Sequence, residues 1–162
     1  MKNIVRMLLI AIFQVGIVRA ETIFHLAMPV STLEGVQEFY EDLGGELVGA
    51  REGVIAFELY GHSIVFRLTE GFQLPDVPFE PIQLNGRLVM IPDRHFGVII
   101  SRDIFEKIEK TMIKKARLFI AQPTLLRSGE IDEMRFMMIQ DPNGYAIEIK
   151  SHLPSTYLPV VK

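Results

Sequence analysis

Apolar residues recur along this chain with two different spacings, and the two spacings follow one another in the same order twice. An apolar run at 22–30 is followed by apolar residues at helical spacing from Val36 to Leu43 and then by short strand-like runs. The order repeats from residue 95, with helical spacing from Ile104 to Met112. A period near two residues indicates strands, and a period near 3.6 residues indicates helices. The pattern therefore predicts an α+β fold built from two βαβββ modules.

Turn and capping residues divide each module at the expected points. Ser31 and Glu34 have the spacing of a capping box at the start of the first helix, which Gly44-Gly45 would end. Ser101 occupies the equivalent place before the second helix. The segment Asp141-Pro-Asn-Gly144 predicts a turn between two strands. We expect strands at 46–50, 54–60 and 63–68 in the first module, and at 95–100, 117–121, 134–139 and 145–150 in the second.

Two pairs of similar segments indicate that the modules are related. His25-Leu-Ala-Met-Pro-Val-Ser31 resembles His95-Phe-Gly-Val-Ile-Ile-Ser101, and Gly61-His-Ser-Ile-Val-Phe-Arg67 resembles Gly144-Tyr-Ala-Ile-Glu-Ile-Lys150. The first pair is 70 residues apart and the second pair 83, so 13 extra residues lie inside the second module. We expect them in the polar stretch 122–131, as a longer loop of the kind that often carries specificity.

The repeat places two histidines and a glutamate at related positions. His25 and His95 begin the first strand of each module. Because side chains alternate between the two faces of a strand, Glu148 and its counterpart Val65 occupy equivalent inward positions on the last strands. Imidazole and carboxylate groups bind borderline divalent ions, and three such ligands leave coordination positions open. We therefore predict a metal site made by His25, His95 and Glu148, with small neighbours such as Gly97 leaving room for a substrate.

Three further polar residues near these positions carry weaker signals. Arg67 and Lys150 share the inward face of their strands, where they would bind an anionic group of a substrate or neutralise the glutamate. A solvated strand end is the simpler alternative for both. His62 falls on the opposite face from Val65, so we do not expect it to bind the metal.

The composition limits the partners and the chemistry. A net charge of −3 without a basic block argues against nucleic acid as a partner and leaves a small-molecule substrate. The absence of cysteine excludes disulfides and thiolate ligands, so a metal would be held by histidine, carboxylate or amide oxygen. This donor set suits Fe(II), Mn(II), Zn(II) or Ni(II).

The first twenty residues differ from the rest of the chain. Lys2 and Arg6 precede an apolar run from Met7 to Val18, and Ala20 closes a small-residue cleavage pattern. The run is too short to span a bilayer, so a mature chain would carry no membrane anchor. A cleaved signal peptide would make the protein periplasmic or secreted, whereas an uncleaved N-terminal extension would leave it cytoplasmic. The expected organisation is the signal peptide or extension at 1–20, one domain at 21–152 (module one 21–69, linker 70–93, module two 94–152) and a tail at 153–162.

The repeated module, with a histidine on the first strand of each half, resembles the vicinal oxygen chelate superfamily of glyoxalases, bleomycin-resistance proteins and extradiol dioxygenases. The chain is most similar to the small predicted extradiol-type dioxygenases. The resemblance implies a curved, cup-like mixed sheet around a metal cavity, with His25, His95 and Glu148 as the metal ligands. It covers residues 22–152 and is carried by Phe24-His25-Leu26, Leu59-Tyr-Gly-His62, His95-Phe-Gly-Val98 and the segment from Asp141 to Lys150.

The resemblance leaves more than one reaction open. Glyoxalase-type members have a fourth Glu or Gln ligand where this chain has Val65, which favours a non-haem Fe(II) dioxygenase that cleaves a catechol-like substrate. A glyoxalase-like lyase or isomerase and a metal-free, drug-sequestering protein are the alternatives. Family members often form dimers, so a homodimer is open as well. Larger extradiol enzymes use acid–base residues, for which His62, Tyr145 and His152 are the weak candidates here.

Overall fold

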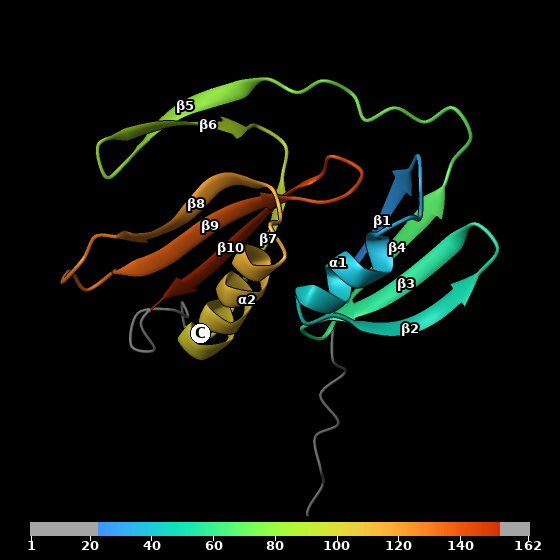
Figure 1. Cartoon of the computed structure of the whole chain (residues 1–162), viewed down its shortest axis with the longest axis horizontal. Helices are drawn as coiled ribbons and strands as arrows, with labels where there is room; N and C mark the ends of the chain where they lie inside the picture. The colour runs from blue at the N-terminus through green and yellow to red at the C-terminus, as the bar shows by residue number, and fades with distance from the viewer. Residues whose placement is uncertain (1–22, 153–162) are drawn as a thin grey trace, which may run out of the picture.

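The computed structural model describes residues 23–152 of the 162-residue chain, in which two similar modules are joined by a β-hairpin (Figure 1). The first module consists of β1 (His25–Val30), α1 (Val36–Asp42), β2 (Glu46–Arg51), β3 (Val54–Leu59) and β4 (His62–Leu68). The second consists of β7 (Phe96–Ile99), α2 (Arg102–Lys114), β8 (Phe119–Leu126), β9 (Met134–Gln140) and β10 (Ala146–His152). The hairpin between them is formed by β5 (Phe79–Leu84) and β6 (Arg87–Pro92).

Each module folds its strands into a four-stranded mixed sheet, and both sheets have the same topology. The strand order is β1-β4-β3-β2 in the first sheet and β7-β10-β9-β8 in the second. The first strand of each module pairs in parallel with the last, whereas the other neighbours are antiparallel. A parallel pair needs a long crossover, which the intervening helix and strands supply. The predicted α+β fold with two βαβββ modules is confirmed.

The two faces of each sheet differ in burial. In β4, Ile64 and Phe66 are buried on the side of the helix, whereas Ser63, Val65 and Arg67 lie on the other side and keep contact with solvent. The isoleucines of β10 are buried in the same alternating manner. We call the side of each sheet that faces away from its helix the open face. The open faces carry the side chains that the alternation predicted to point inward.

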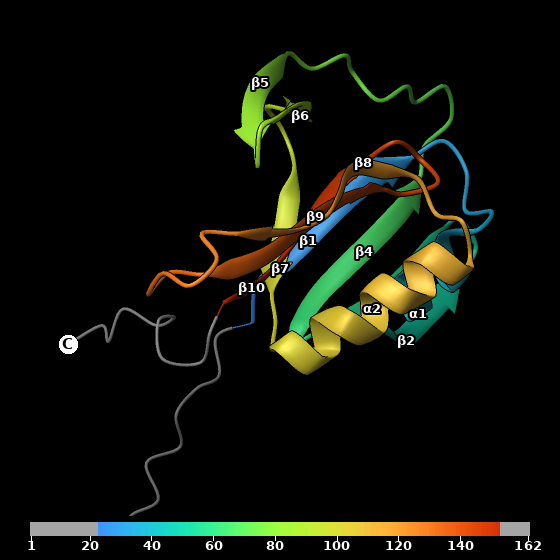
Figure 2. The ribbon, with the colours of Figure 1, turned by 60° about the vertical axis from the view of Figure 1, so that its left-hand side comes forward.

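The two helices lie side by side and share one hydrophobic core (Figures 1 and 2). Phe39 and Tyr40 of α1 are fully buried, and the ring of Tyr40 packs against Phe66 with centroids 4.5 Å apart. Residues of α2, such as Phe105, belong to the same buried cluster. Each large side chain buried in this way stabilises the fold by about 1.5–3 kcal/mol relative to its exposed state. The modules are therefore joined by packing as well as by the chain.

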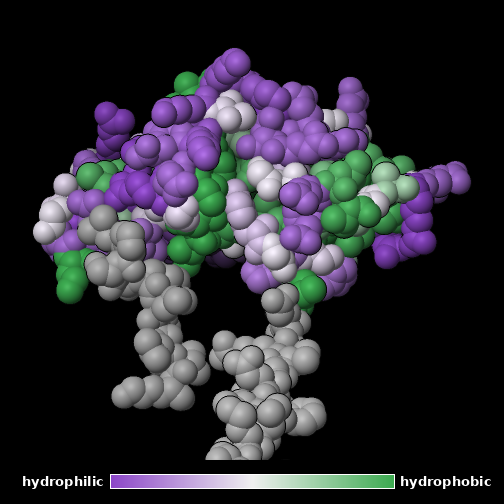
Figure 3. Space-filling view, turned by 90° about the horizontal axis from the view of Figure 1, so that it is seen from below, coloured by the Kyte–Doolittle hydropathy of each residue, from purple (hydrophilic) through white to green (hydrophobic). Residues whose placement is uncertain are grey.

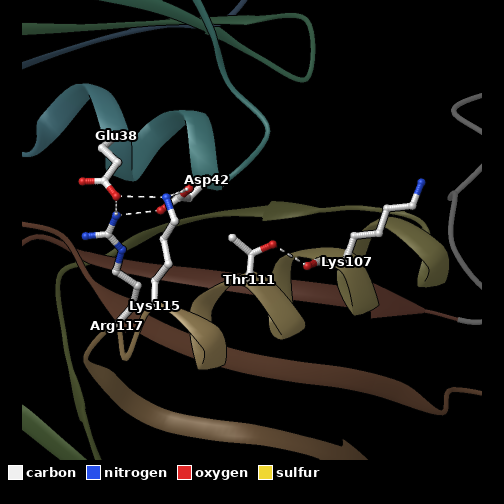
Figure 4. A network of polar contacts seen from close by, with 6 residues as sticks. All are labelled: Glu38, Asp42, Lys107, Thr111, Lys115 and Arg117. Atoms are coloured by element: carbon white, nitrogen blue, oxygen red, sulfur yellow. Dashed lines mark hydrogen bonds and ion pairs between the residues drawn. The ribbon is translucent and has the colours of Figure 1, made fainter.

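Ion pairs connect α1 with the segment that leaves α2 (Figure 4). Lys115 Nζ lies 2.9 Å from Glu38 Oε1 and 2.7 Å from Asp42 Oδ1, and Arg117 Nη2 lies 2.6 Å from Asp42 Oδ2. The side chain of Asp42 is 10% exposed, whereas that of Glu38 is 61% exposed. Burial acts to raise the pKa of Asp42, but the hydrogen bonds from Lys115 and Arg117 outweigh it and the pKa is lowered.

The predicted turn at Asp141-Pro-Asn-Gly144 is present, and it also binds the first module. Asn143 Oδ1 accepts hydrogen bonds from the backbone N–H groups of Ser31 and Thr32 at 3.1 and 3.2 Å. Asn143 Nδ2 donates to the Thr32 carbonyl at 3.0 Å. Asp141 is held by the backbone N–H groups of Asn143 and Tyr145, and burial is the main reason why its pKa is raised. One turn thus organises the end of β9 and the end of β1.

The first helix begins later than the sequence predicted. Ser31 does not cap it, because the Ser31 hydroxyl donates to Asn143 instead. The N-cap is Gly35, whose φ of 72° is left-handed and favours glycine. Ser101 does occupy the N-cap position of α2, although its hydroxyl donates to Asp103 rather than accepting a backbone N–H bond.

The stretch 70–93 contains a hairpin that we did not predict. Leu84 and Ile91 of the hairpin are buried against a second core cluster that includes Met138. The turn is Asn85-Gly86, and both residues have positive φ. An Asn-Gly pair between apolar alternations is a strong hairpin signal. The surrounding prolines, which are typical of irregular linkers, predicted a linker here instead. The hairpin covers part of the open face of the second sheet.

The polar stretch 122–131 is not a single loop, since β8 continues to Leu126 with two register shifts against β9. The predicted signal peptide at 1–20 and the tail at 153–162 lie outside the described residues. Within residues 23–152, none of the helices is both long and apolar enough to cross a membrane. Apolar side chains reach the surface on both halves of the molecule (Figure 3). The large apolar side chains that are more than half exposed include Val48, Leu88 and Leu118.

Candidate metal centre

His95 and Glu148 lie next to each other on the open face of the second sheet. Nε2 of His95 is 4.0 Å from Oε2 of Glu148, and the two side chains are 28% and 20% exposed. Lys150 lies on the same face, as the alternation along the strand predicted, and its Nζ is 2.8 Å from the same Glu148 oxygen. Of the two roles considered for Lys150, the contact seen in the structure is the neutralisation of Glu148.

Gly97 brings β7 close to β10 at Glu148. The two residues are direct neighbours in the parallel ladder. A Cβ atom on Gly97 would lie 2.5 Å from the carbonyl oxygen of Glu148 and 2.9 Å from its Cβ. We expected this glycine to leave room for a substrate, but β10 occupies that space. The absent side chain instead lets Glu148 approach the strand that His95 precedes.

A backbone carbonyl fixes the proton of the His95 ring. Nδ1 of His95 lies 2.9 Å from the carbonyl oxygen of Pro92. A carbonyl can only accept, so Nδ1 is the protonated nitrogen and Nε2 of the neutral ring carries the lone pair. Histidines that bind metals commonly donate their other N–H group to a carbonyl in this way. The lone pair of His95 Nε2 therefore lies on the side of the ring that is near Glu148.

His25 lies on the open face of the first sheet, where a serine holds its ring. Nδ1 of His25 is 3.0 Å from Oγ of Ser63, its partner in the parallel ladder. The pair leaves Nε2 of His25 without this constraint and available to a ligand. Val65 and Arg67 line the same groove, which has a volume of about 400 Å³. Val65 presents an apolar side chain to the groove beside His25.

The three predicted ligands do not come together within one chain. His95 lines a separate cavity of about 670 Å³, which also involves β1, residues 74–79 and the turn between β9 and β10. His25 lines the groove on the first sheet. Among residues 23–152, no group of three or more His, Cys, Asp or Glu side chains is arranged to hold a metal ion. The predicted ligands thus lie in two places, with His95 beside Glu148 in one and His25 in the other.

The three weak acid–base candidates lie in different surroundings. His62 is exposed at the first position of β4. Tyr145 lines the larger cavity, but its hydroxyl donates to the carbonyl of Pro29 at 2.7 Å, and burial raises its pKa. His152 ends β10 on the side of Glu148, and burial, followed by the charge of Lys150, lowers its pKa.

Two residues near the predicted ligands, Pro92 and Arg51, were not predicted from the sequence. Pro92 acts through its backbone carbonyl, which leaves no signal in the sequence. Arg51 lines the groove together with Arg67. The signal for Arg51 is the alternation along β2. Arg51 lies two residues after Gly49 and therefore on the same, open face of the sheet.

Solved structures of other proteins share the fold of this chain. A glyoxalase/bleomycin resistance protein/dioxygenase from Alicyclobacillus acidocaldarius is similar with a TM-score of 0.62 at 23% identity, covering 82% of this chain and 92% of that one. The fosfomycin resistance protein FosX of Listeria monocytogenes gives 0.58 at 11% identity, covering 85% and 98%. FosX of Mesorhizobium loti gives 0.55 at 15% identity, covering 80% and 90%. No family model matches the sequence, and no curated protein matches it. At these identities the similarity establishes the fold.

Proposed function

We propose that this chain, which has the fold of the vicinal oxygen chelate superfamily, is one subunit of a homodimeric enzyme that uses a divalent metal ion to transform a small molecule. One observation carries the proposal: the chain presents His95 beside Glu148 on one open face and His25 on another. Each face lacks what the other supplies. A second copy of the chain would complete both sites.

A two-fold dimer satisfies this requirement in a simple way. If the open face of the first sheet in one copy covers the open face of the second sheet in the other, symmetry repeats the contact and creates two equal sites. Apolar side chains fill the part of this open face beyond the row of His25, and Ala27, Val54, Ala56 and Val65 are all only partly buried or exposed. Open apolar surface of this kind is typical of a protein interface.

The donor set of the combined site fits a divalent ion. It would contain two neutral imidazoles and one carboxylate, which suit Fe(II), Mn(II), Zn(II) or Ni(II). Pro92 orients the ring of His95, and Ser63 orients the ring of His25. These second contacts are the kind that hold metal-binding histidines in place. A bound Fe(II) ion would supply chelation of adjacent substrate oxygens and the redox chemistry that dioxygen requires.

Cleavage of a catechol-like ring by an extradiol-type dioxygenase is the reaction that we propose. The supporting feature is Val65, which puts an apolar side chain where the glyoxalase type has its fourth ligand. Val65 and Ala56 form an apolar wall of the groove beside His25, which suits an aromatic ring and excludes water. Lys150, beside Glu148, keeps the carboxylate neutralised when no other cation is present.

A glyoxalase-like lyase or isomerase is the second candidate. Solved structures with this fold include a possible glyoxalase from Bacillus cereus, which is 18% identical and has a TM-score of 0.53. Such an enzyme would work with Zn(II) or Ni(II) and would need no oxygen. A metal-free protein that sequesters small molecules is the third candidate, because the 670 Å³ cavity beside His95 is large enough for one.

Metal quantitation tests the site directly. Wild-type protein reconstituted with Fe(II) without oxygen should hold about one ion per subunit. His25→Ala, His95→Ala and Glu148→Ala should each lose most of this metal, whereas His62→Ala should keep it. Wild-type metal content in all three site variants would rule out this set of ligands, and a wild type without metal affinity would favour sequestration.

Mixing two inactive variants tests whether the site is shared. In a mixed dimer of His25→Ala and His95→Ala subunits, one of the two sites keeps all its ligands. After unfolding and refolding an equal mixture, metal content should return to about a quarter of the wild-type value, since half of the dimers are mixed. No recovery above the separate variants would overturn the shared site.

Oxygen consumption separates the candidate reactions. Fe(II)-loaded protein should consume oxygen with catechols, and the ring-cleaved product should absorb in the visible range. Turnover of an oxoaldehyde thiol adduct or an epoxide with Zn(II) or Ni(II), but no oxygen uptake, would favour the lyase or isomerase.

A further inference from the structure

The open face of the first sheet is organised in three rows of side chains across its strands. The strand register places His25, Ser63 and Glu58 in one row and Ala27, Val65, Ala56 and Gly49 in the next. The third row contains Pro29, Arg67, Val54 and Arg51. Directly paired residues have their side chains on the same face of a sheet, so the side chains of all three rows lie on the open face. The face therefore has a histidine end and an arginine end.

The two arginines flank one valine. Arg67 on β4 and Arg51 on β2 are both paired with Val54 on the strand between them. Adjacent strands are about 4.8 Å apart, so the two Cα atoms are about 10 Å apart. Side chains of this length converge easily on a single group placed above the valine. The arginines thus form the two sides of a pocket floored by Val54.

Neither guanidinium group has a partner in the part of the chain that the structure describes. Arg51 and Arg67 both line the groove, and their side chains make no hydrogen bond or ion pair with any residue from 23 to 152. The other arginines with structural roles, such as Arg117 and Arg135, are paired with carboxylates. Two unpaired cations in one groove attract an anion.

Acidic groups on the same face lie at the other end. Glu58 and its partner Glu46 belong to the row of His25. Four residues along a strand separate this row from the arginine row, which corresponds to about 13 Å between Cα atoms. The small side chains of the middle row, Ala27, Ala56 and Gly49, leave the space between the ends open. The face is therefore polarised along the strands.

We infer that Arg51 and Arg67 bind the oxyanion group of the substrate, and that the substrate is a small organic acid whose other end reaches His25. This inference rests on the proposed function, because it takes the metal at His25 as the reacting end. Guanidinium groups bind a carboxylate or a phosphonate through paired hydrogen bonds. For a ring-cleaving enzyme, the substrate class is a catechol that carries an acid group on the ring or on a short side chain.

Matched ligands test the inference on the full-length protein. The probes are 3,4-dihydroxybenzoate and its neutral methyl ester, which share the catechol group and differ in charge. Binding is measured by calorimetry without oxygen, first on Fe(II)-loaded and then on metal-free protein. Wild type should bind the acid at least about tenfold more tightly than the ester, a ratio expected for charge-assisted hydrogen bonds. Phenylphosphonate should compete with the acid, and phenol should not.

Arginine variants connect the preference to these two residues. Arg51→Gln with Arg67→Gln should abolish the preference for the acid and leave binding of the ester within about twofold. Arg51→Lys and Arg67→Lys keep the charge and should retain part of the preference. The control is Arg87→Gln on the hairpin, an exposed arginine outside the groove, which should behave as wild type.

The outcomes separate this inference from the proposed function. Equal binding of acid and ester by wild type, or a preference that survives in the double variant, would overturn the inference. Absence of binding by either ligand would overturn it too. A preference that depends on the arginines in metal-free protein, together with no metal affinity, would support the inference and reject the metal-dependent function.

Discussion

Tyr40 Oη donates a hydrogen bond of 3.1 Å to Asp141 Oδ2, and this buried contact joins the helix of the first module to the turn of the second. Burial raises the pKa of Asp141 above its ordinary value of 3.8. The folded state therefore binds the Asp141 proton more tightly than the unfolded state does. This group makes the protein less stable as the pH rises from about 3.8 through the raised pKa, and the loss is complete above it.

Asp141→Asn should remove this component of the pH dependence. The amide keeps an oxygen for the N–H groups of Asn143 and Tyr145, and its NH₂ group can donate to Tyr40. Urea unfolding of both proteins between pH 4 and pH 7 gives the difference curve. We expect wild type to lose stability relative to the variant as the pH rises. A flat difference curve would contradict the raised pKa.

The ion pairs of Asp42 should contribute more to stability than those of its neighbour Glu38. Asp42→Asn leaves the guanidinium of Arg117 without its main partner in a half-buried site, and should cost about 1–3 kcal/mol. The lowered pKa means that this stabilisation is present above pH 3.8 and is lost as the pH falls through the folded-state pKa. Chemical denaturation at pH 7 and at pH 3 measures both effects.

Glu38→Gln is the matched control for that experiment. Its carboxylate contacts the same two cations, but the side chain is 61% exposed and solvent screens it. We expect little change in the free energy of unfolding. Equal losses in the two variants would show that burial does not separate them.

Gly97→Ala should damage the predicted metal site and the fold together. The new methyl group would meet the backbone of Glu148 at 2.5–3.2 Å, so β10 or β7 must move. Overpacking of this kind costs about 1–3 kcal/mol, and displacement of Glu148 should weaken metal binding. Gly49→Ala is the control for stability, because no atom lies within 4 Å of its added Cβ. Thermal unfolding and metal titration of both variants test the difference.

Lys150→Met should strengthen metal binding. The ammonium group of Lys150 lies 2.8 Å from Glu148 Oε2 and competes with any other cation for this carboxylate. Its removal should lower the apparent Kd for Fe(II) or Zn(II) by about tenfold, because one unit of positive charge disappears beside the ion. Lys107→Met on α2 should leave the Kd unchanged. Weaker metal binding in Lys150→Met would mean that the lysine supports the site.

The sequence was sufficient for the modules because local and repeated signals agree. The alternation along β4 and β10 correctly grouped Ser63 with Val65 and Glu148 with Lys150, since strand geometry fixes the face of every residue once one is known. The sequence did not predict Gly35 as the N-cap of α1. Ser31 has the better capping chemistry, but in the structure it is hydrogen-bonded to Asn143 of the other module. Local propensity carries no information about such distant partners.

The candidate site was predictable in part, because strand alternation fixes the face on which each side chain lies. Alternation identified which face His25, His95 and Glu148 belong to, but it says nothing about how two faces meet. The Pro92 carbonyl and the close approach at Gly97 depend on the tertiary path of the backbone. The hairpin at Asn85-Gly86 has a local turn signal in the sequence, but four prolines between residues 75 and 92 give the same stretch the composition of a linker. The metal ligands and the substrate remain predictions that the experiments above address.

The contact between Asn143 and the segment Ser31–Thr32 makes the repeat unequal. At the position equivalent to Asn143, the first module has Tyr60, whose hydroxyl donates to Leu43 within the same module. In the described part of the chain, the second module therefore satisfies backbone groups of the first without a matching bond in return. During synthesis the first module leaves the ribosome well before Asn143 is added. The connection between β1 and α1 can thus reach its final form only after Asn143 has been added and the second module has begun to fold.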